Sequence, residues 1–252
     1  MRARIFAERC IKELLRDPLS WLFCLAFPMG MLGIMTLLNT SLPPEASLVI
    51  FRIDYLAAGI AVFGFSFLML FTALLAARDR STALLTRLFI SPMRAQDFLL
   101  GYAVPPLCIA AGQILLTYLA ALGIGALTDV SLSVGKLCLS ALMHMPTVIL
   151  FVSLGLLFGT LFSDKSAPGF SSFIISAAGM LGGIWMDVDT IGGVLADICR
   201  ALPFYHAIRL GRAAIVGTDL RDTLISLAVV CGYAALTSCL TVVIFRRRMR
   251  VK

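Results

Sequence analysis

The sequence predicts an all-α polytopic membrane protein with six transmembrane helices. Hydrophobic residues make up 60% of the 252 residues and charged residues only 14%, and the mean hydropathy is +0.98. These values lie outside the range of soluble domains. The apolar residues also fall in long runs separated by basic segments. Around these runs the sequence predicts three further elements: an N-terminal amphipathic surface helix, a charged cytoplasmic helix, and an extracellular helical hairpin before the last span.

Six segments meet the length requirement for a spanning helix, which is about 20 predominantly apolar residues. None of them contains Asp, Glu, Lys or Arg. Apart from Tyr and Cys, His144 is the one ionisable residue deep within them. The predicted spans are Pro18–Leu38, Tyr55–Ala77, Phe98–Leu127, Leu137–Phe162, Ala167–Met186 and Leu224–Phe245.

The positions of the basic residues predict the orientation. Lys and Arg concentrate in the N-terminal flank, the loops after the second and fourth predicted spans, and the C-terminal tail. Cytoplasmic loops carry such an excess, so both termini are expected in the cytoplasm. The net charge of +7 is then explained by topology and by contact with anionic membrane lipids, and no nucleic-acid partner is needed.

Residues 1–17 are predicted to form the surface helix. Ala7, Cys10, Ile11, Leu14 and Leu15 recur at i, i+3, i+4 spacing opposite charged residues, which is typical of a helix lying on a membrane surface. The segment is too charged for a cleavable signal peptide, and no small-residue cleavage site follows the apolar segment Pro18–Leu38. A plain basic topology anchor remains the alternative.

The charged segment 78–97 follows the second predicted span. Leu84, Leu85, Leu88 and Phe89 form one apolar stripe, and Ser91-Pro92 is typical of a helix end followed by a new start. Charges at the bilayer centre are costly, so this helix cannot be buried in lipid and must lie in water or against another protein. We expect it to be docked on another protein. The alternative is a solvated loop whose stripe faces lipid.

Segment 187–222 is too polar to span a bilayer. Residues 191–202 and 204–216 are predicted as two short helices broken at Pro203, because proline ends one helix and begins the next. They form the hairpin expected to cap the extracellular end of the bundle.

Residues for catalysis are few, and we expect no catalytic site. No GxxxxGK[ST] loop or HExxH motif is present. His144 precedes Met145-Pro146, and a hydrogen bond to a carbonyl freed by the proline explains it. Asp187 and Asp189 suit helix caps or solvated charges better than a cation site. The seven cysteines have no CxxC or metal-ligand spacing, so neither a disulfide nor a metal site is expected.

Two stretches resemble a known family. Residues 80–93 are similar to the coupling-helix region of the ABC-2 type permeases, the membrane subunits of exporter-type ATP-binding-cassette transporters, which commonly ends in Ser-Pro. Residues 183–217, with the Leu-Pro turn at Pro203, resemble the family's external hairpin. The chain departs from the family at Asp79 and residues 81–83, where glutamates and a glycine are frequent, and at Tyr102, where lysine is frequent.

The resemblance implies that residues 1–252 form one ABC-2 type transmembrane domain. It implies pairing with a second copy or a similar permease, and docking of two separate ATPase subunits on the coupling helix and the N-terminal surface helix. ATP and Mg would be bound by those ATPases, and no cofactor by this chain. The location implied is a bacterial plasma membrane, and the direction is outward.

The resemblance also implies three groups of functional residues. The expected ATPase-coupling residues are Arg78, Asp79, Arg80, Leu84, Leu85, Arg87 and Leu88. The expected extracellular gate comprises Trp185, Met186, Pro203, Phe204, Tyr205 and His206. The candidate cargo path comprises Phe63, Phe67 and Phe71 in the second span and Phe170 and Phe173 in the fifth. Such an apolar path suits a hydrophobic or amphipathic cargo, whether drug-like, lipid or glycolipid, or peptide. A non-transporting membrane anchor and an intramembrane enzyme are the alternatives.

Overall fold

The structure, a computed structural model, describes residues 2–43, 45, 47–82 and 95–250. Every regular element in these ranges is helical. Four of the predicted coupling residues, Leu84, Leu85, Arg87 and Leu88, lie outside the described residues. The elements of the first half are α1 (Arg2–Arg16), α2 (Pro18–Trp21), a π-helical turn (Leu22–Ala26), α3 (Phe27–Ser41), a 3-10 turn (Val49–Phe51), α4 (Ile53–Ser81) and α6 (Ala95–Leu127). Those of the second half are α7 (Val134–Met143), α8 (Met145–Leu161), α9 (Ala167–Leu181), α10 (Val188–Ile191), α11 (Gly193–Ala201), α12 (Pro203–Val216) and α13 (Leu220–Arg250).

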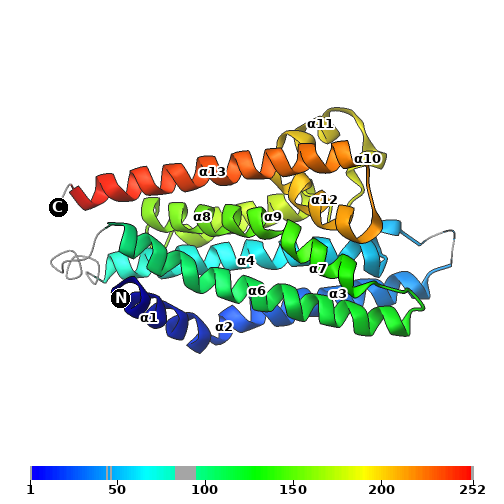
Figure 1. The fold of residues 1–252 in the computed structure, drawn as a ribbon, viewed down its shortest axis with the longest axis horizontal. Coiled ribbons are helices and arrows are strands. Elements are labelled where there is room, and N and C mark those ends of the chain that lie inside the picture. The colour runs from blue at the N-terminus through cyan, green and yellow to red at the C-terminus, as the bar shows by residue number, and fades with distance from the viewer. Residues whose placement is uncertain (1, 44, 46, 83–94, 251–252) are drawn as a thin grey trace.

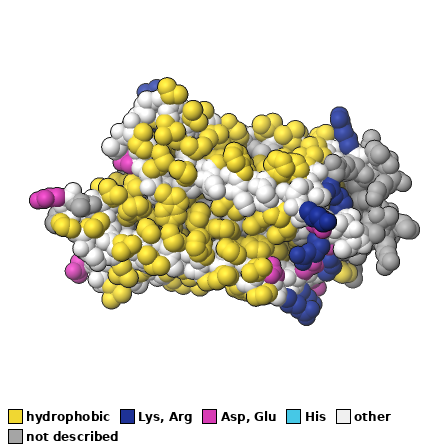
Figure 2. Space-filling view, turned by 180° about the vertical axis from the view of Figure 1, so that it is seen from behind, with side chains coloured by type: hydrophobic (Ala, Val, Ile, Leu, Met, Phe, Trp, Pro, Cys, Tyr) yellow, Lys and Arg dark blue, Asp and Glu magenta, His cyan; other side chains and the backbone are white. Residues whose placement is uncertain are grey.

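The long helices lie side by side in one elongated bundle (Figure 1). Helix α4 forms its centre and packs against α3, α6, α8, α9 and α12. The N-terminus, the C-terminus and the start of α6 lie at one end, which we call the terminal end; α10, α11 and α12 lie at the opposite, far end (Figure 1). Most of the Lys and Arg side chains visible in Figure 2 gather near the terminal end, and apolar side chains cover much of the length between the two ends.

Five described helical segments are long and apolar enough to cross a membrane: Pro18–Ser41, Ile53–Ser81, Asp97–Leu127, Val134–Leu161 and Leu220–Arg247. The predicted span over 167–186 is shorter than expected. Helix α9 has 15 residues, or about 22 Å at 1.5 Å per residue, because the chain turns at Gly182 and Gly183, where Gly183 adopts φ of +82°.

Helix α1 packs against α6 through its apolar face. Phe6, Cys10 and Leu14 are buried, whereas Leu15 is 43% exposed. The buried stripe is therefore narrower than the sequence pattern predicted. Asp17 ends the helix and caps α2, accepting a hydrogen bond from the Leu19 N–H at 3.2 Å.

Two glycines bring α8 into close contact with α4. A Cβ atom added to Gly155 would lie 2.6 Å from the Met69 carbonyl oxygen, and one added to Gly159 would lie 2.7 Å from the Ala73 carbonyl oxygen. The Gly-x-x-x-Gly spacing, which favours close helix approach in membranes, is thus used within the chain.

Replacing Gly159 with alanine should therefore separate α8 from α4. Because the nearest atoms include backbone, the added methyl group is not accommodated by a side-chain rotation, and we expect a loss of stability of about 1–3 kcal/mol. Thermal unfolding in detergent measures this effect. Gly112→Ala is the matched control, since a Cβ there has no neighbour within 4 Å; equal unfolding midpoints for the two variants would contradict the packing.

Candidate functional site

Asp79 lies at the terminal end of α4 and connects three helices. Its side chain is 3% exposed, and both carboxylate oxygens accept hydrogen bonds from the Arg9 guanidinium of α1 at 2.7 Å. The Tyr102 hydroxyl of α6 donates to the same carboxylate at 2.8 Å. Arg9 also forms a salt bridge with Glu13 of the same helix at 2.7 Å. We call Asp79, Arg9 and Tyr102 the Asp79 junction.

The electrostatics of α1 reflect this junction. The hydrogen bond to Asp79 raises the pKa of Arg9 above its ordinary value, against the opposing effect of burial. Burial raises the pKa of the neighbouring Cys10 thiol to about 12, so Cys10 is a neutral packing residue. A bidentate arginine–carboxylate pair fixes both distance and orientation, and α1 is thereby held against α4 and α6.

Arg80 makes a second connection at the same end. Its guanidinium donates to the carbonyl oxygens of Thr160 and Phe162, at the end of α8. Arg78, by contrast, is exposed. Of the predicted coupling residues that the structure describes, Asp79 and Arg80 thus tie the last turn of α4 to its neighbours.

The aromatic side chains of α4 meet those of the first span. Phe63 and Phe67 contact each other with ring centroids 5.1 Å apart, and Phe27 lies 6.0 Å from Phe63 and 5.8 Å from Phe67. Phe23 stacks on Phe67 at 5.4 Å, and Trp185 meets Phe63 edge-on at 5.4 Å. We call these five residues the aromatic cluster. Phe63 and Phe67 are each 8% exposed, whereas Phe27 is 40% exposed, so Phe27 forms its accessible rim.

The structure does not bring the whole predicted cargo path together. Phe71 is buried and lines a separate pocket near the end of α1. Phe170 stacks on Phe162 at 3.9 Å, and Phe173 is 71% exposed on the surface of α9. Sequence reasoning missed Phe27, although its spacing of four residues from Phe23 was a signal for one helix face.

The predicted gate residues lie at the far end but belong to different contacts. Trp185 joins the aromatic cluster, and Met186 is half-buried beside it in the chain. Pro203 begins α12, where its missing N–H is tolerated. Phe204 is buried and stacks on Phe151 of α8 at 6.0 Å. The Tyr205 hydroxyl lies 2.9 Å and 3.0 Å from the two carboxylate oxygens of Asp189.

A sequence profile described as an ABC-2 family transporter protein matches residues 39–243, which is more than half of the chain. The chain belongs to the ABC-2 family. No curated protein matches it. The protein is therefore the multi-pass membrane component of an ABC transporter, a component that associates with an ABC ATPase. Among the described residues no group of three or more His, Cys, Asp or Glu side chains is arranged to hold a metal ion, and all seven cysteines are free.

In this ABC-2 protein the two aspartates 187 and 189 act as local partners. Asp187 caps α10 by accepting from the Asp189 N–H at 3.1 Å and from the Thr190 hydroxyl at 2.7 Å. Arg200 donates to Asp189 at 3.1 Å. Asp187 thus agrees with the helix-cap interpretation, whereas Asp189 pairs with Arg200 and Tyr205 and caps no described helix.

His206 holds the far-end helices together as a neutral imidazole. Its Nε2 lies 2.9 Å from the Arg200 carbonyl oxygen and donates to it, so its Nδ1 accepts from the Ser226 hydroxyl of α13 at 3.0 Å. Burial lowers the pKa of His206 below its ordinary value. Protonation would turn Nδ1 into a donor, so it could no longer accept the hydrogen bond from the Ser226 hydroxyl.

The far-end helices should therefore loosen at acidic pH. Because the folded-state pKa of His206 is lowered, the unfolded form takes up the proton first as pH falls below about 6.5, so this contribution to stability is complete above that pH and is lost below it. Hydrogen exchange across α11 and α12, corrected for intrinsic rates, should be faster at pH 5.5 than at pH 7.5. His206→Gln should abolish the difference; an unchanged pH dependence in that variant would contradict the assignment.

His144 lies at the break between α7 and α8 and differs from expectation. It is 0% exposed, and neither ring nitrogen has a hydrogen-bond partner among the described residues. The expected bond to a carbonyl freed by Pro146 is therefore absent from the structure. The ring instead meets Phe65 edge-on at 5.7 Å and faces Gly211 of α12, where a Cβ atom would lie 2.3 Å from Nε2. The ring's fit thus depends on glycine at position 211.

Proposed function

We propose that this ABC-2 protein is the permease half of an ATP-driven exporter. In this proposal it crosses the membrane six times, with α9 as a short fifth crossing, and pairs with a second copy or a similar permease. Two ATPase subunits, which bind ATP and Mg, dock on segment 78–97. The observation that carries the proposal is the Asp79 junction, because it fixes three helices beside the segment that follows α4.

We also propose that the basic terminal end lies in the cytoplasm. Arg78 and Arg80 of α4, together with Arg246 and Arg247 of α13, lie at the membrane-flanking ends of spanning helices, where an excess of Lys and Arg marks the cytoplasmic side. Both termini are then cytoplasmic, and the membrane is the plasma membrane of a bacterium. The far-end helices α10, α11 and α12 face outward.

The contacts of α4 suit the transmission of force. A push on segment 78–97 acts first on the last turn of α4, where Asp79 holds α1 and α6 and Arg80 holds the end of α8. Charge-assisted hydrogen bonds are directional and strong, so the four helix ends move together. Closure of the ATPase pair would therefore shift the bundle rather than bend a loop.

The aromatic cluster is the proposed contact surface for cargo. Phe27 forms its rim, Phe63 and Phe67 lie beneath, and Trp185 extends it toward the far end. Apolar rings favour a hydrophobic or amphipathic cargo, such as a drug-like compound, a lipid or a peptide. The neighbouring far-end residues Met186, Pro203, Phe204, Tyr205 and His206 would form the outward gate.

A double substitution in the coupling segment tests this function. Arg87→Glu combined with Leu88→Asp should abolish ATP-driven transport while leaving the bundle folded and the ATPase subunits able to hydrolyse ATP, because both the basic charge and the apolar stripe of the docking surface are removed. Transport and ATP hydrolysis are measured together in proteoliposomes. A double variant that transports with normal coupling would show that the segment does not transmit force.

A further inference from the structure

We propose that the elbow between α1 and the first span binds one anionic phospholipid. The elbow consists of residues 12–25, the last turn of α1 with α2 and the start of the π-helical turn. The phosphate group would be held by Lys12, Arg16 and Arg78, and one acyl chain would lie against Trp21. Of these residues, Arg78 also belongs to the segment on which the ATPase subunits are proposed to dock.

The headgroup side of the elbow is an open, charged cleft of about 700 Å³. Its acidic lining residues already have partners: Glu8 pairs with Arg4 at 3.1 Å and Glu13 pairs with Arg9 at 2.7 Å. Asp17 accepts from the Ser20 hydroxyl at 2.9 Å. Glu8 and Glu13 are thus paired with arginines, whereas Asp17 has only hydrogen bonds among the described residues and keeps its negative charge.

Three of the basic residues that line the cleft lack acidic partners in the described structure. Lys12, Arg16 and Arg78 are exposed, and no salt bridge to an acidic side chain is formed by them within the part of the chain that the structure describes. The cleft thus presents three cations beside the junction of α1 with the first span. Anionic lipids attract such residues, and each basic residue near the surface strengthens binding about fivefold.

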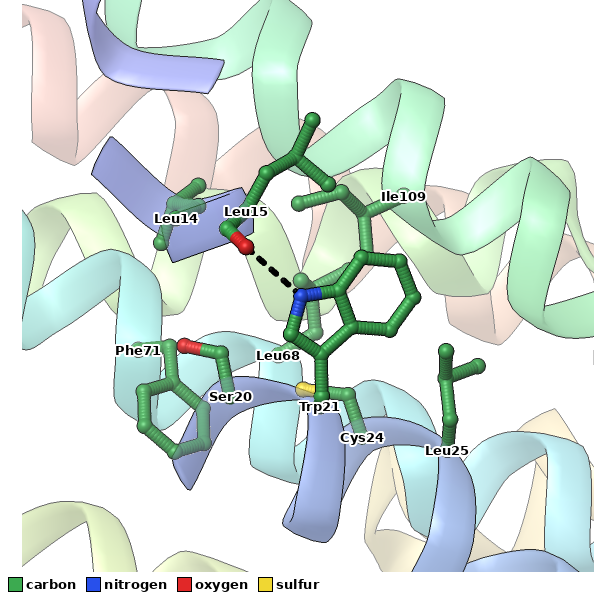
Figure 3. Close-up of a pocket in the computed structure, with 9 residues that line it drawn as sticks. All are labelled: Leu14, Leu15, Ser20, Trp21, Cys24, Leu25, Leu68, Phe71 and Ile109. Carbon is green, nitrogen blue, oxygen red and sulfur yellow. Dashed lines mark hydrogen bonds between the residues drawn. The ribbon is translucent and has the colours of Figure 1, made fainter. Parts of the chain in front are cut away.

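The acyl-chain side of the elbow is an apolar surface around a narrow pocket of about 20 Å³ (Figure 3). An acyl chain would therefore lie along the exposed face of Trp21 and not inside the pocket. Leu14 and Leu15 of α1, Trp21 and Leu25 of the first span, and Ile109 of α6 line it. The Trp21 indole N–H donates to the Leu15 carbonyl oxygen at 2.7 Å and so holds the ring beside the pocket (Figure 3). Trp21 remains 46% exposed.

The combination of cleft and pocket selects a lipid as the occupant. The same few residues separate the charged side from the apolar side, since Arg16 and Pro18 line the cleft while Leu15 and Trp21 line the pocket. An amphiphile with an anionic head satisfies both sides at once. An acidic protein loop would satisfy the cations but would leave the apolar side unoccupied.

Trp21 supplies the test, because the chain has only two tryptophans. In the Trp185→Phe variant Trp21 is the sole indole, and its quenching is measured in bilayers that contain dibrominated phosphatidylglycerol or dibrominated phosphatidylcholine at the same mole fraction. We expect phosphatidylglycerol to quench more strongly at low mole fraction and to saturate. Lys12→Gln with Arg16→Gln should lower its relative affinity about 25-fold, since two basic residues are removed.

The matched control removes the same charge elsewhere at the terminal end. Arg246→Gln with Arg247→Gln, both exposed on α13, should leave the preference unchanged. Equal quenching by the two lipids, or equal losses in the two double variants, would overturn the proposal in favour of general surface attraction. A Lys12/Arg16 variant that keeps its lipid preference but releases an ATPase subunit would show that the cleft docks protein, and would also overturn it.

Discussion

Asp79→Ala is expected to release α1 from the bundle and to destabilise the protein by about 3 kcal/mol, because breaking a buried ion pair leaves its partners uncompensated. Asp79 is 2% exposed, and its loss leaves the buried Tyr102 hydroxyl without this acceptor. Arg9 is 37% exposed on its side chain and retains Glu13, which limits the cost. Hydrogen exchange in α1 and the unfolding midpoint in detergent measure the two effects.

Two variants with smaller expected losses of stability provide a comparison for Asp79→Ala. Tyr102→Phe removes one hydrogen bond and should cost about 1 kcal/mol. Glu13→Gln weakens the half-exposed Arg9–Glu13 contact and should cost less than about 1 kcal/mol. If α1 exchanges at the same rate in Asp79→Ala as in Glu13→Gln, the Asp79 junction does not hold α1 to the bundle.

Phe27→Ala is expected to reduce export of a hydrophobic cargo about tenfold while leaving the fold intact. Phe27 contributes three ring contacts, to Phe23, Phe63 and Phe67, and each aromatic pair contributes about 0.5–1.5 kcal/mol beyond its buried area. Because Phe27 is 40% exposed, its truncation disturbs the core less than truncation of Phe63 would. ATP-dependent movement of a lipophilic fluorescent probe in proteoliposomes with the partner ATPase is the measurement.

Phe173→Ala provides the control for the same substitution on an exposed ring of a neighbouring helix. Phe173 is 71% exposed and forms no ring contact with the aromatic cluster in the described structure. Transport should remain near that of the unmodified protein. A loss as large as that of Phe27→Ala would mean that the aromatic cluster has no special role in export.

The helical class and most helix boundaries follow from the sequence, because apolar runs and helix-breaking residues such as proline determine them locally. The apolar run in α4 and the break at Pro203 are visible without any tertiary contact. The length of α9 was not predictable from hydropathy alone, since Gly182 and Gly183 are apolar enough to extend the run but turn the chain instead.

The candidate sites depend on pairings that a single sequence does not reveal. Asp79 was expected among the ATPase-coupling residues and as a departure from the family pattern, but nothing in the sequence joins it to Arg9, 70 residues away. Phe71 belongs to the same periodic stripe as Phe63 and Phe67, yet it lines the elbow pocket. His144 was expected to be satisfied locally, but the approach of Gly211 from α12 sets its surroundings.

The most direct test of the central claim is to purify the tagged chain in mild detergent from its native host and identify what accompanies it. The account predicts a complex in which two copies of this chain, or one copy with a similar permease, carry two subunits that contain a nucleotide-binding loop. A chain that is recovered without such a subunit, and that remains without one after cross-linking in intact membranes, would contradict the assignment as an exporter permease.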